Sequence, residues 1–318
     1  MQPDRLAAMR AAVRDGMHAR PRIIPPKFFY DERGSELFEA ITALPEYYPT
    51  RAEREILDTR VAAWIRELEP RSLVELGAGS AEKTRILLEA MLEVAGAARV
   101  LYAPVDVSAD FLRATAERLA AAYPTLDVMP IVADLTQDFQ LPDDLPRPLV
   151  VAFLGSTIGN FGRGDAAALL RRAAVSLADA DRLLLGVDLK KDPALLNAAY
   201  NDSAGVTAEF DLNVLRVLNR ELGADFDPDA FRHHAFYDEA GGRVEMHLVA
   251  TQAMRVTIPE VGTFDLEAGE SILTEISRKY DHAEVDVTLA GAGLAVEHWF
   301  EVPPGYAVVV AKTVAGSR

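Results

Sequence analysis

Between about residues 71 and 190, short apolar runs alternate with longer segments whose apolar residues recur at helical spacing. This alternation is the signature of a parallel β-sheet wrapped by helices, so the fold class is predicted to be α/β. The second strand is expected to end at Asp106 and the third at Asp134. The predicted strands are SLVELG, RVLYAPVDVS, VMPIVADL, PLVVAFLG and RLLLGVDL, separated by the predicted helices AEKTRILLEAMLEVAG, ADFLRATAERLAAAYP and DAAALLRRAAVSLA.

The alternation stops near residue 190 and resumes close to the C-terminus. Residues 191 to about 235 are predicted to be helical, and RVEMHLVATQAMRVTI is predicted to form an antiparallel pair of strands. After a helix at VDVTLAGAGL, the segment AVEHWFEVPPGYAVVVAKTV is expected to add two strands that close the sheet. The aromatic-rich first 50 residues lie outside the alternation and are predicted to form a cap. We therefore predict one domain from 1–51 and 191–280, and another from 52–190 and 281–318.

The segment ESILTEISRKY, residues 270 to 280, has two interpretations. As a strand, it would point Glu275 and Ser277 to the same face, where they would share one pocket wall. As a helix, it would pair Glu275 with Lys279 on a solvated face, because residues four apart are neighbours there. Periodicity alone leaves both interpretations open.

Composition excludes several classes of protein. The chain has 318 residues and no cysteine, so disulfides, thiolate zinc sites and cysteine nucleophiles are excluded. The adjacent His233 and His234 suit no metal pair, and no metal site is predicted. Lys plus Arg total 33 against 49 for Asp plus Glu, a net charge of -16, so neither nucleic acid nor an anionic membrane is an expected partner. The chain begins with charged residues and contains no long apolar run, so we expect a cytoplasmic protein.

A glycine turn, ELGAGSAEKT, follows the first predicted strand, where doubly wound folds bind a ligand. Gly77 and Gly79 allow close approach of a ligand to the backbone, but Glu82 occupies the third glycine position of a nicotinamide-binding turn. Together with Asp106 and Asp134 at two strand ends, the turn is typical of class I S-adenosylmethionine methyltransferases. Asp106 would accept the ribose hydroxyls and Asp134 would lie beside the adenine. A Rossmann-like domain that binds another ligand, or none, is the alternative.

A longer series of motifs resembles the histidine-specific Nα-methyltransferases of ergothioneine biosynthesis. The resemblance covers nearly the whole chain in order, and its substrate-domain motifs are long and unusual. The matching segments are PPKFFYDERGSELFEAITALPEYYPTRAEREIL, LVELGAGSAEKTR, FLGSTIGNF, AYNDSAGVTAEFDLNVLRVLNRELGADFD, RVEMHL and ILTEISRKY. The resemblance implies a Rossmann-like class I methyltransferase sheet with a smaller α+β substrate-binding domain, formed by the N-terminus and an insertion.

The resemblance also implies roles for individual residues in binding L-histidine. Asn160 and Tyr200 would hold the substrate carboxylate, and Tyr30 would lie near the reacting amine. The imidazole would be faced by a tyrosine, hydrogen-bonded by a glutamate and a serine, and packed by a methionine; these residues are Tyr47, Glu275, Ser277 and Met246.

On the cofactor side, Gly77, Lys83, Asp106 and Asp134 match the family, whereas Leu135 stands where some relatives are expected to have an aromatic residue. The implied cofactor is S-adenosylmethionine, released as S-adenosylhomocysteine, and the implied product is hercynine. We expect a monomer that needs no metal.

Several of these residues have plainer interpretations. Tyr47, Tyr200 and Met246 are also typical of a hydrophobic core, and Asn160 of a cap on the helix that follows it. Methylation of tryptophan or tyrosine is an alternative reaction, which Glu275 and the bulk of Met246 disfavour. A non-catalytic S-adenosylmethionine-binding module is the alternative from another class, and it has no use for a substrate pocket.

Overall fold

A computed structural model describes residues 3–107 and 109–314. The chain divides into two compact units, each formed by two separate segments. Unit 1 comprises Met1–Tyr48 and Lys191–Ser277, and unit 2 comprises Pro49–Lys190 and Arg278–Arg318. The sequence-based boundaries at 51/52 and 280/281 lie three residues beyond these junctions, and the boundary at 190/191 coincides with one.

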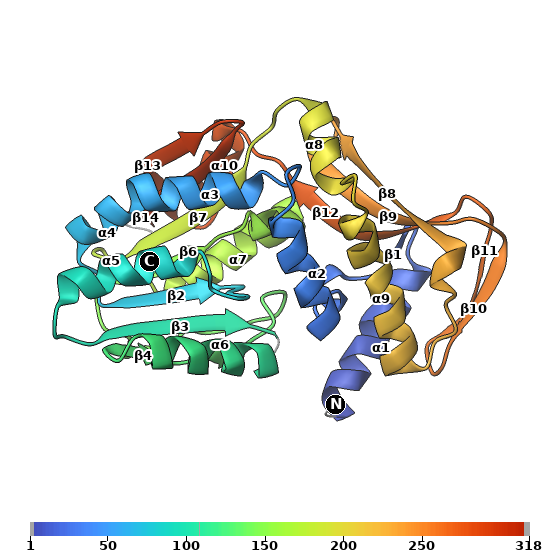
Figure 1. Ribbon diagram of the computed structural model, residues 1–318, viewed down its shortest axis with the longest axis horizontal. Coiled ribbons are helices and arrows are strands. Elements are labelled where there is room, and N and C mark those ends of the chain that lie inside the picture. Colours follow the sequence, from blue (N-terminus) through green and yellow to red (C-terminus); the bar gives the residue numbers. More distant parts are fainter. Residues whose placement is uncertain (1–2, 108, 315–318) are drawn as a thin grey trace. The chain divides into compact units, whose positions relative to one another are not determined.

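Unit 2 contains an eight-stranded sheet (Figure 1). Its strand order is β13-β14-β7-β6-β2-β3-β4, with β5 also paired to β3. All pairs among β2 to β7 are parallel, whereas β14 and β13 run antiparallel at one side, which confirms the predicted closing strands. The strands are β2 (Ser72–Leu76), β3 (Val100–Asp106), β4 (Leu126–Val128), β5 (Ile131–Val132), β6 (Leu149–Phe153), β7 (Arg182–Asp188), β13 (Leu294–Val302) and β14 (Tyr306–Thr313).

β2 and β6 are buried along their whole length, because helices cover both faces of this sheet. One apolar core joins the sheet to α3, α4, α5 and α6, and a second joins its other face to α7 and α10. The predicted α/β class is thereby confirmed. The helices are α3 (Pro49–Ile56), π-helical η2 (Leu57–Val61), α4 (Ala62–Leu68), α5 (Thr84–Ala95), α6 (Ala109–Ala122), η3 (Thr157–Asn160), α7 (Arg163–Val175) and α10 (His282–Ala290).

The third predicted strand is shorter than expected. VMPIVADL was expected to run to Asp134, but β4 ends at Val128 and β5 covers only Ile131–Val132. Pro130 lies between them and has no backbone N–H to donate to a ladder, which explains the interruption. Asp134 consequently follows the strand by two residues.

Unit 1 combines helices with two small sheets. A four-stranded sheet has the order β1-β12-β9-β8, and β10 and β11 form a separate antiparallel pair. One apolar core contains residues from both segments of the unit. The elements are α1 (Pro3–His18), β1 (Arg22–Ile23), η1 (Pro26–Phe28), α2 (Glu32–Thr42), α8 (Pro193–Tyr200), α9 (Val206–Leu222), η4 (Pro228–Ala230), β8 (Phe231–Asp238), β9 (Arg243–Ala250), β10 (Met254–Ile258), β11 (Gly262–Leu266) and β12 (Ser271–Arg278).

Two sequence predictions in unit 1 were wrong. The helical segment expected to reach residue 235 ends at Leu222, where Gly223 adopts a left-handed φ of 69° and closes α9. The residues from Phe231 onward form β8, since aromatic side chains suit a pleated surface. RVEMHLVATQAMRVTI is not a hairpin either, because β9 pairs with β8 and β10 pairs with β11.

Asp31 fixes the start of α2 against α9. Its side chain accepts a hydrogen bond from Gly34 N at 2.7 Å, as an N-cap does, and others from Asn213 Nδ2 and Arg220 Nη1 at 2.8 Å. A Cβ on Gly34 would lie 1.7 Å from the Phe29 carbonyl oxygen, so this turn requires glycine. The DERG motif therefore ties the N-terminal segment of unit 1 to its second segment.

Candidate active site

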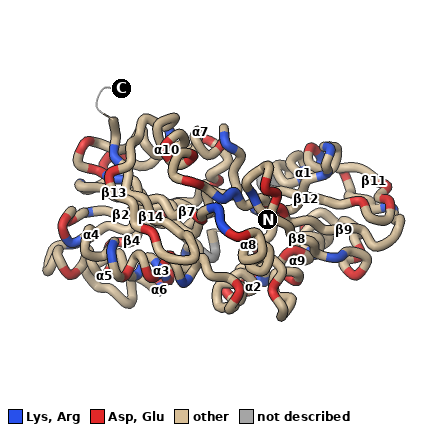
Figure 2. Tube along the Cα trace, turned by 90° about the horizontal axis from the view of Figure 1, so that it is seen from above, with Lys and Arg blue, Asp and Glu red and all other residues tan. Residues whose placement is uncertain are grey.

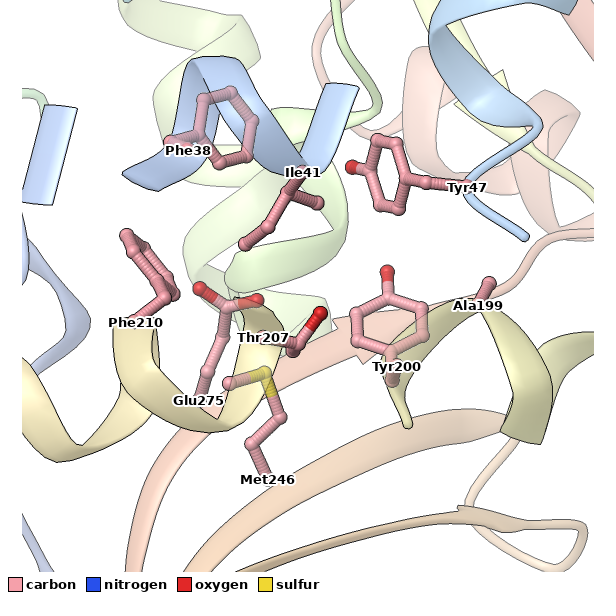
Figure 3. Close-up of a pocket in the computed structure, with 9 residues that line it drawn as sticks. All are labelled: Phe38, Ile41, Tyr47, Ala199, Tyr200, Thr207, Phe210, Met246 and Glu275. Atoms are coloured by element: carbon pink, nitrogen blue, oxygen red, sulfur yellow. The ribbon is translucent and has the colours of Figure 1, made fainter. Parts of the chain in front are cut away.

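A pocket in unit 1 is formed where α2, α8 and α9 meet β9 and β12 (Figure 3). Its empty space is about 290 Å³, a volume that includes space open to solvent. Figure 3 shows the Glu275 carboxylate pointing into this space, with Met246 beneath it. The lining residues are Phe38, Ile41, Tyr47, Ala199, Tyr200, Thr207, Phe210, Met246 and Glu275.

The ILTEIS segment is a strand, as one of its two interpretations required. Glu275 and Ser277 are two residues apart on β12 and therefore face the same way. Glu275 lines the pocket, and Ser277 Oγ accepts a hydrogen bond of 2.8 Å from the Tyr200 hydroxyl. The helical interpretation was wrong: Lys279, with no exposed side-chain area, instead pairs with Asp188 within unit 2 at 2.9 Å.

Aromatic rings form one side of the pocket. The Tyr47 ring makes edge contacts with Tyr200 and Phe38, at centroid distances of 6.3 and 6.4 Å. Tyr30 is not among the lining residues, but its ring contacts Phe38 at 5.8 Å and Phe210 at 5.7 Å. Four of the predicted substrate residues thus line one pocket, while Tyr30 and Ser277 lie directly behind its lining side chains.

Sequence reasoning missed five lining residues: Phe38, Ile41, Ala199, Thr207 and Phe210. Four of them form two pairs at i,i+3 spacing, on α2 and on α9, so each pair shares a helix face. Such spacing is common to every amphipathic helix, which is why it did not single these residues out.

Asn160, the seventh predicted substrate residue, belongs to unit 2. It ends the short 3-10 helix η3, which follows Ser156 in a left-handed conformation with φ 55°. The N-cap of α7 is Gly162, so the interpretation of Asn160 as the cap of that helix was wrong. Its expected position relative to Glu275 stays a prediction.

The glycine turn of unit 2 follows β2, which pairs with β3 on one side and β6 on the other. This is the point where strand order reverses, and such points bind ligands. Gly77 and Gly79 have φ of 69° and 51°, a region that favours glycine. Gly79 N donates to Asp106 Oδ2 at 3.2 Å, and a Cβ on Gly79 would meet no atom within 4 Å. The turn thus contacts Asp106 and faces open space.

Leu135 and Asp134 belong to the same region. A Cβ on Gly77 would lie 4.0 Å from Leu135 Cδ1, so the Leu135 side chain lies beside the turn. Asp134 Oδ1 accepts hydrogen bonds from the backbone and hydroxyl of Thr136 at 2.9 and 2.5 Å. The parallel pairing of Asp106 with Val132 places the end of β3 beside the strand that Asp134 follows by two residues.

Lys83 forms an ion pair with Glu53 of α3, whose side chain has no exposed area. Glu53 Oε1 also accepts hydrogen bonds from the Tyr306 hydroxyl at 2.6 Å and from Gly155 N at 2.7 Å. A Cβ on Gly186 would lie 2.3 Å from the same oxygen, so glycine there makes room for the carboxylate. This buried acid therefore fixes the lysine at the end of the glycine turn.

Glu75 lies on β2 just before the turn and is buried. Burial raises the pKa of Glu75 to about 7, although hydrogen bonds from Thr84 Oγ1 at 2.6 Å and the Tyr102 hydroxyl at 2.5 Å act in the opposite direction. The carboxyl supporting the turn thus ionises well above the usual pH range of a glutamate.

Figure 2 shows Asp and Glu spread over the helices and loops of both units. Across residues 3–107 and 109–314, no group of three or more His, Asp or Glu side chains is arranged to hold a metal ion. Within those ranges, the helices are also too short or too polar to cross a membrane.

Comparison with known proteins identifies the family. The family model of histidine-specific, SAM-dependent methyltransferases matches residues 9–313. A histidine N-alpha-methyltransferase of Mycolicibacterium smegmatis is 46% identical over 94% of this chain and 92% of its own length. Ergothioneine biosynthesis protein 1 of Neurospora crassa is 36% identical over 88% of this chain and 32% of its own length.

A relative named for another substrate is also similar. The L-tryptophan methyltransferase trpM of Psilocybe serbica is 30% identical over 90% of this chain and 87% of its own length. The family model nevertheless spans nearly all of the chain, and the mycobacterial relative is the more similar of the two. The family resemblance found in the sequence is thereby confirmed. This chain belongs to the family of histidine-specific, S-adenosylmethionine-dependent methyltransferases.

Proposed function

We propose that the protein transfers three methyl groups from S-adenosylmethionine to the α-amino group of L-histidine, producing hercynine for ergothioneine biosynthesis. The observation that carries this proposal is the pocket of unit 1, where Glu275 and Met246 lie beneath a wall of aromatic rings. An imidazole needs an acceptor for its N–H group and apolar contact for its ring, and this pocket offers both. The names of the Mycolicibacterium and Neurospora relatives support the same reaction.

Within the pocket, Glu275 accepts a hydrogen bond from the imidazole, and Ser277 acts with it from the same strand face. Hydrogen bonds to charged groups contribute roughly 1.5 to 3 kcal/mol. Tyr47 faces the ring and Met246 packs beside it. Tyr200, with Asn160 of unit 2, holds the substrate carboxylate. The amine is left as the free end of the substrate.

S-adenosylmethionine supplies an electrophilic methyl group on sulfur. The amine must first lose its proton, because an ammonium nitrogen has no lone pair, and we propose that water carries this proton away with help from Tyr30. Fixing both ends of the substrate restricts the amine, and positioning of this kind contributes roughly 7 to 11 kcal/mol. Each transfer forms one N–C bond and breaks one S–C bond. The final quaternary ammonium suits an aromatic face, worth roughly 0.5 to 2 kcal/mol, which gives Tyr30 a second role.

The glycine turn of unit 2 is the proposed cofactor site. The open space beside Gly79 and the carboxylate of Asp106 fit a ligand that carries hydroxyl groups. Asp106 would accept hydrogen bonds from the ribose hydroxyls, and Asp134 and Leu135 would contact the adenine. Gly77 and Lys83 would contact the methionine portion, whose carboxylate suits the lysine charge.

We further propose that the enzyme acts as a cytoplasmic monomer without a metal ion, and that it binds neither nucleic acid nor membranes. The net charge of -16 supports the last two points, because such a surface repels phosphate groups. Light scattering should give the mass of one chain, 34.7 kDa, and the activity should survive a chelator.

Nα-methylation of tryptophan is the second candidate, favoured by the similarity to trpM. To distinguish the candidates, the protein is incubated with S-adenosylmethionine and each amino acid in turn, and the masses of the products are measured by mass spectrometry. Histidine should gain three methyl groups. A methylated tryptophan or tyrosine without methylated histidine would replace the proposal, and cofactor binding without any methylated amino acid would indicate a binding module. The Asp106→Ala variant serves as the control, since it should neither bind the cofactor nor form product.

A further inference from the structure

His233 and His234 are adjacent on β8 but have different surroundings. The His233 side chain is only 6% exposed, whereas His234 is an exposed residue. Neighbouring strand residues point to opposite faces, so only His233 faces α8 and α9. The proposed function assigns no role to either histidine.

His233 caps the C-terminal end of α8. The last carbonyl groups of a helix have no partner inside the helix, and Tyr200 is the last residue of α8. His233 Nε2 lies 2.8 Å from the Tyr200 carbonyl oxygen. Asn201 Nδ2 donates to the Asn197 carbonyl oxygen at 2.7 Å, which satisfies a second carbonyl. The end of the helix is thus held by two side chains.

The contacts of His233 suit a charged ring. Its Nδ1 lies 2.6 Å from Asp211 Oδ2, and Asp211 has no exposed side-chain area. Both partners of the ring are oxygen atoms, and an imidazolium, which donates from both nitrogens, satisfies them together when the Asp211 carboxyl is ionised. Burial alone would lower the pKa of His233, but the Asp211 carboxylate and the Tyr200 carbonyl together raise it above its usual value. A cation at a helix C-terminus is also favoured by the helix dipole.

The rest of α8 is attached to the outer edge of β8. Asn197 Oδ1 accepts a hydrogen bond from Tyr237 N at 2.7 Å. Asn201 bonds to both backbone groups of Ala235, donating to the carbonyl oxygen at 3.0 Å and accepting from the nitrogen at 3.3 Å. These amides replace a neighbouring strand, since β8 is the last strand of its sheet. His233, on the same strand, adds its contact with the Tyr200 carbonyl oxygen to these attachments of α8.

Tyr200 is the residue that this attachment positions. Its hydroxyl donates to Ser277 Oγ at 2.8 Å, and its side chain lines the pocket. We propose that His233 is a positioning residue for substrate binding: held by Asp211, it fixes the end of α8 and keeps the Tyr200 hydroxyl at the pocket wall. This inference rests on the proposed function, in which Tyr200 binds the substrate carboxylate.

Steady-state kinetics of His233→Gln test the proposal, with His234→Gln as the matched control. The KM for histidine should rise at least about tenfold in the first variant, because a charge-assisted contact is lost, and should stay unchanged in the second. The Kd for S-adenosylhomocysteine, which binds unit 2 in the proposed function, should be unchanged in both. An unchanged KM in active His233→Gln would overturn the inference. Wild-type protein that fails to methylate histidine would instead count against the proposed function.

A double-mutant cycle separates positioning from general damage. If His233 acts through Tyr200, then His233→Gln should leave the KM unchanged in a Tyr200→Phe background. A tenfold rise in that background as well would mean that His233 acts by another route, and the inference would fail.

Nitrogen NMR of the histidine rings gives a test that does not depend on activity or on the stability of a variant. At neutral pH both ring nitrogens of His233 should be protonated in the wild-type chain. His234 should be neutral, since burial and the neighbouring Arg232 lower its pKa. A neutral His233 ring would contradict the proposal.

Discussion

Glu275 is the residue on which substrate choice depends in the proposed function. Replacing it with alanine removes the charged acceptor for the imidazole N–H while leaving Met246 and the aromatic wall in place. We predict that Glu275→Ala lowers kcat/KM for histidine by roughly 10- to 150-fold, equivalent to about 1.5 to 3 kcal/mol. The measurement is steady-state kinetics at saturating cofactor.

The matched control is Glu239→Ala, which removes an exposed carboxylate from the turn between β8 and β9. Its kinetics should equal those of the wild type. If both variants lose activity equally, general charge or stability is responsible. If neither does, the imidazole lies elsewhere.

A second prediction concerns stability and the buried carboxyl group of Glu75. Its pKa is about 7 in the folded chain and near 4.5 when unperturbed. Between these two pH values the folded chain therefore keeps a proton that the unfolded chain has lost. The free energy of unfolding contributed by this group is therefore present below pH 4.5 and lost as pH rises through about 7, by on the order of 3 kcal/mol.

Glu75→Gln has no such proton to lose. The variant's gain in free energy of unfolding over the wild type should be larger above the folded-state pKa of Glu75 than below its unperturbed pKa. Urea unfolding at a pH on either side of this interval measures the difference. The exposed Glu239→Gln should show no such pH-dependent difference. A constant difference between Glu75→Gln and wild type at all pH values would show that Glu75 ionises normally in the folded chain.

Some single-residue predictions followed from local geometry and others were out of reach. The shared face of Glu275 and Ser277 follows from the pleat of any strand, once the segment is known to be one. The contact between Lys83 and Glu53 joins residues 30 positions apart, and no local pattern specifies it. The same holds for His233 and Asp211, because which strand residue meets which helix residue depends on how both pack.

At the level of elements, α2 depends on Gly34 more than on any propensity. We predict that Gly34→Ala destabilises the chain by at least about 1 to 3 kcal/mol, since its Cβ would overlap the Phe29 carbonyl oxygen. The matched control is Gly164→Ala in α7, where a Cβ would meet no atom within 4 Å. That variant should be neutral or more stable by up to about 1 kcal/mol, because alanine is the better helix former. Thermal unfolding of both variants tests the prediction, and equal melting temperatures would contradict it.

The elements of unit 2 were predictable because each strand lies between helices of regular spacing. Those of unit 1 were harder, for two physical reasons. β1 has only two residues and pairs with β12, so its existence depends on a distant partner. β10 and β11 pair with each other beside a sheet that already contains β9, and the sequence does not say which neighbour each strand selects.

At the scale of the molecule, the proposed cofactor residues belong to unit 2 and the pocket to unit 1. We predict that S-adenosylhomocysteine alone protects the amides of residues 77–83 and 105–106 from hydrogen exchange. At 100 times its Kd it should stabilise the protein by about 2.7 kcal/mol. Glu275→Ala should show the same protection and the same rise in melting temperature. Protection confined to unit 1, or a loss of binding in that variant, would contradict this division.

The parallel pairing of β1 with β12 has a consequence for synthesis on the ribosome. Arg22 of β1 bonds to Glu270, a residue 248 positions later in the chain. At about 5 to 20 residues per second, translation of that interval takes roughly 12 to 50 s. Val13, Met17 and Ile24 have no exposed area in the finished fold, and until β12 is made their core lacks Ile272. The nascent N-terminal segment of unit 1 therefore stays incompletely buried during this interval, and a holding chaperone would protect it.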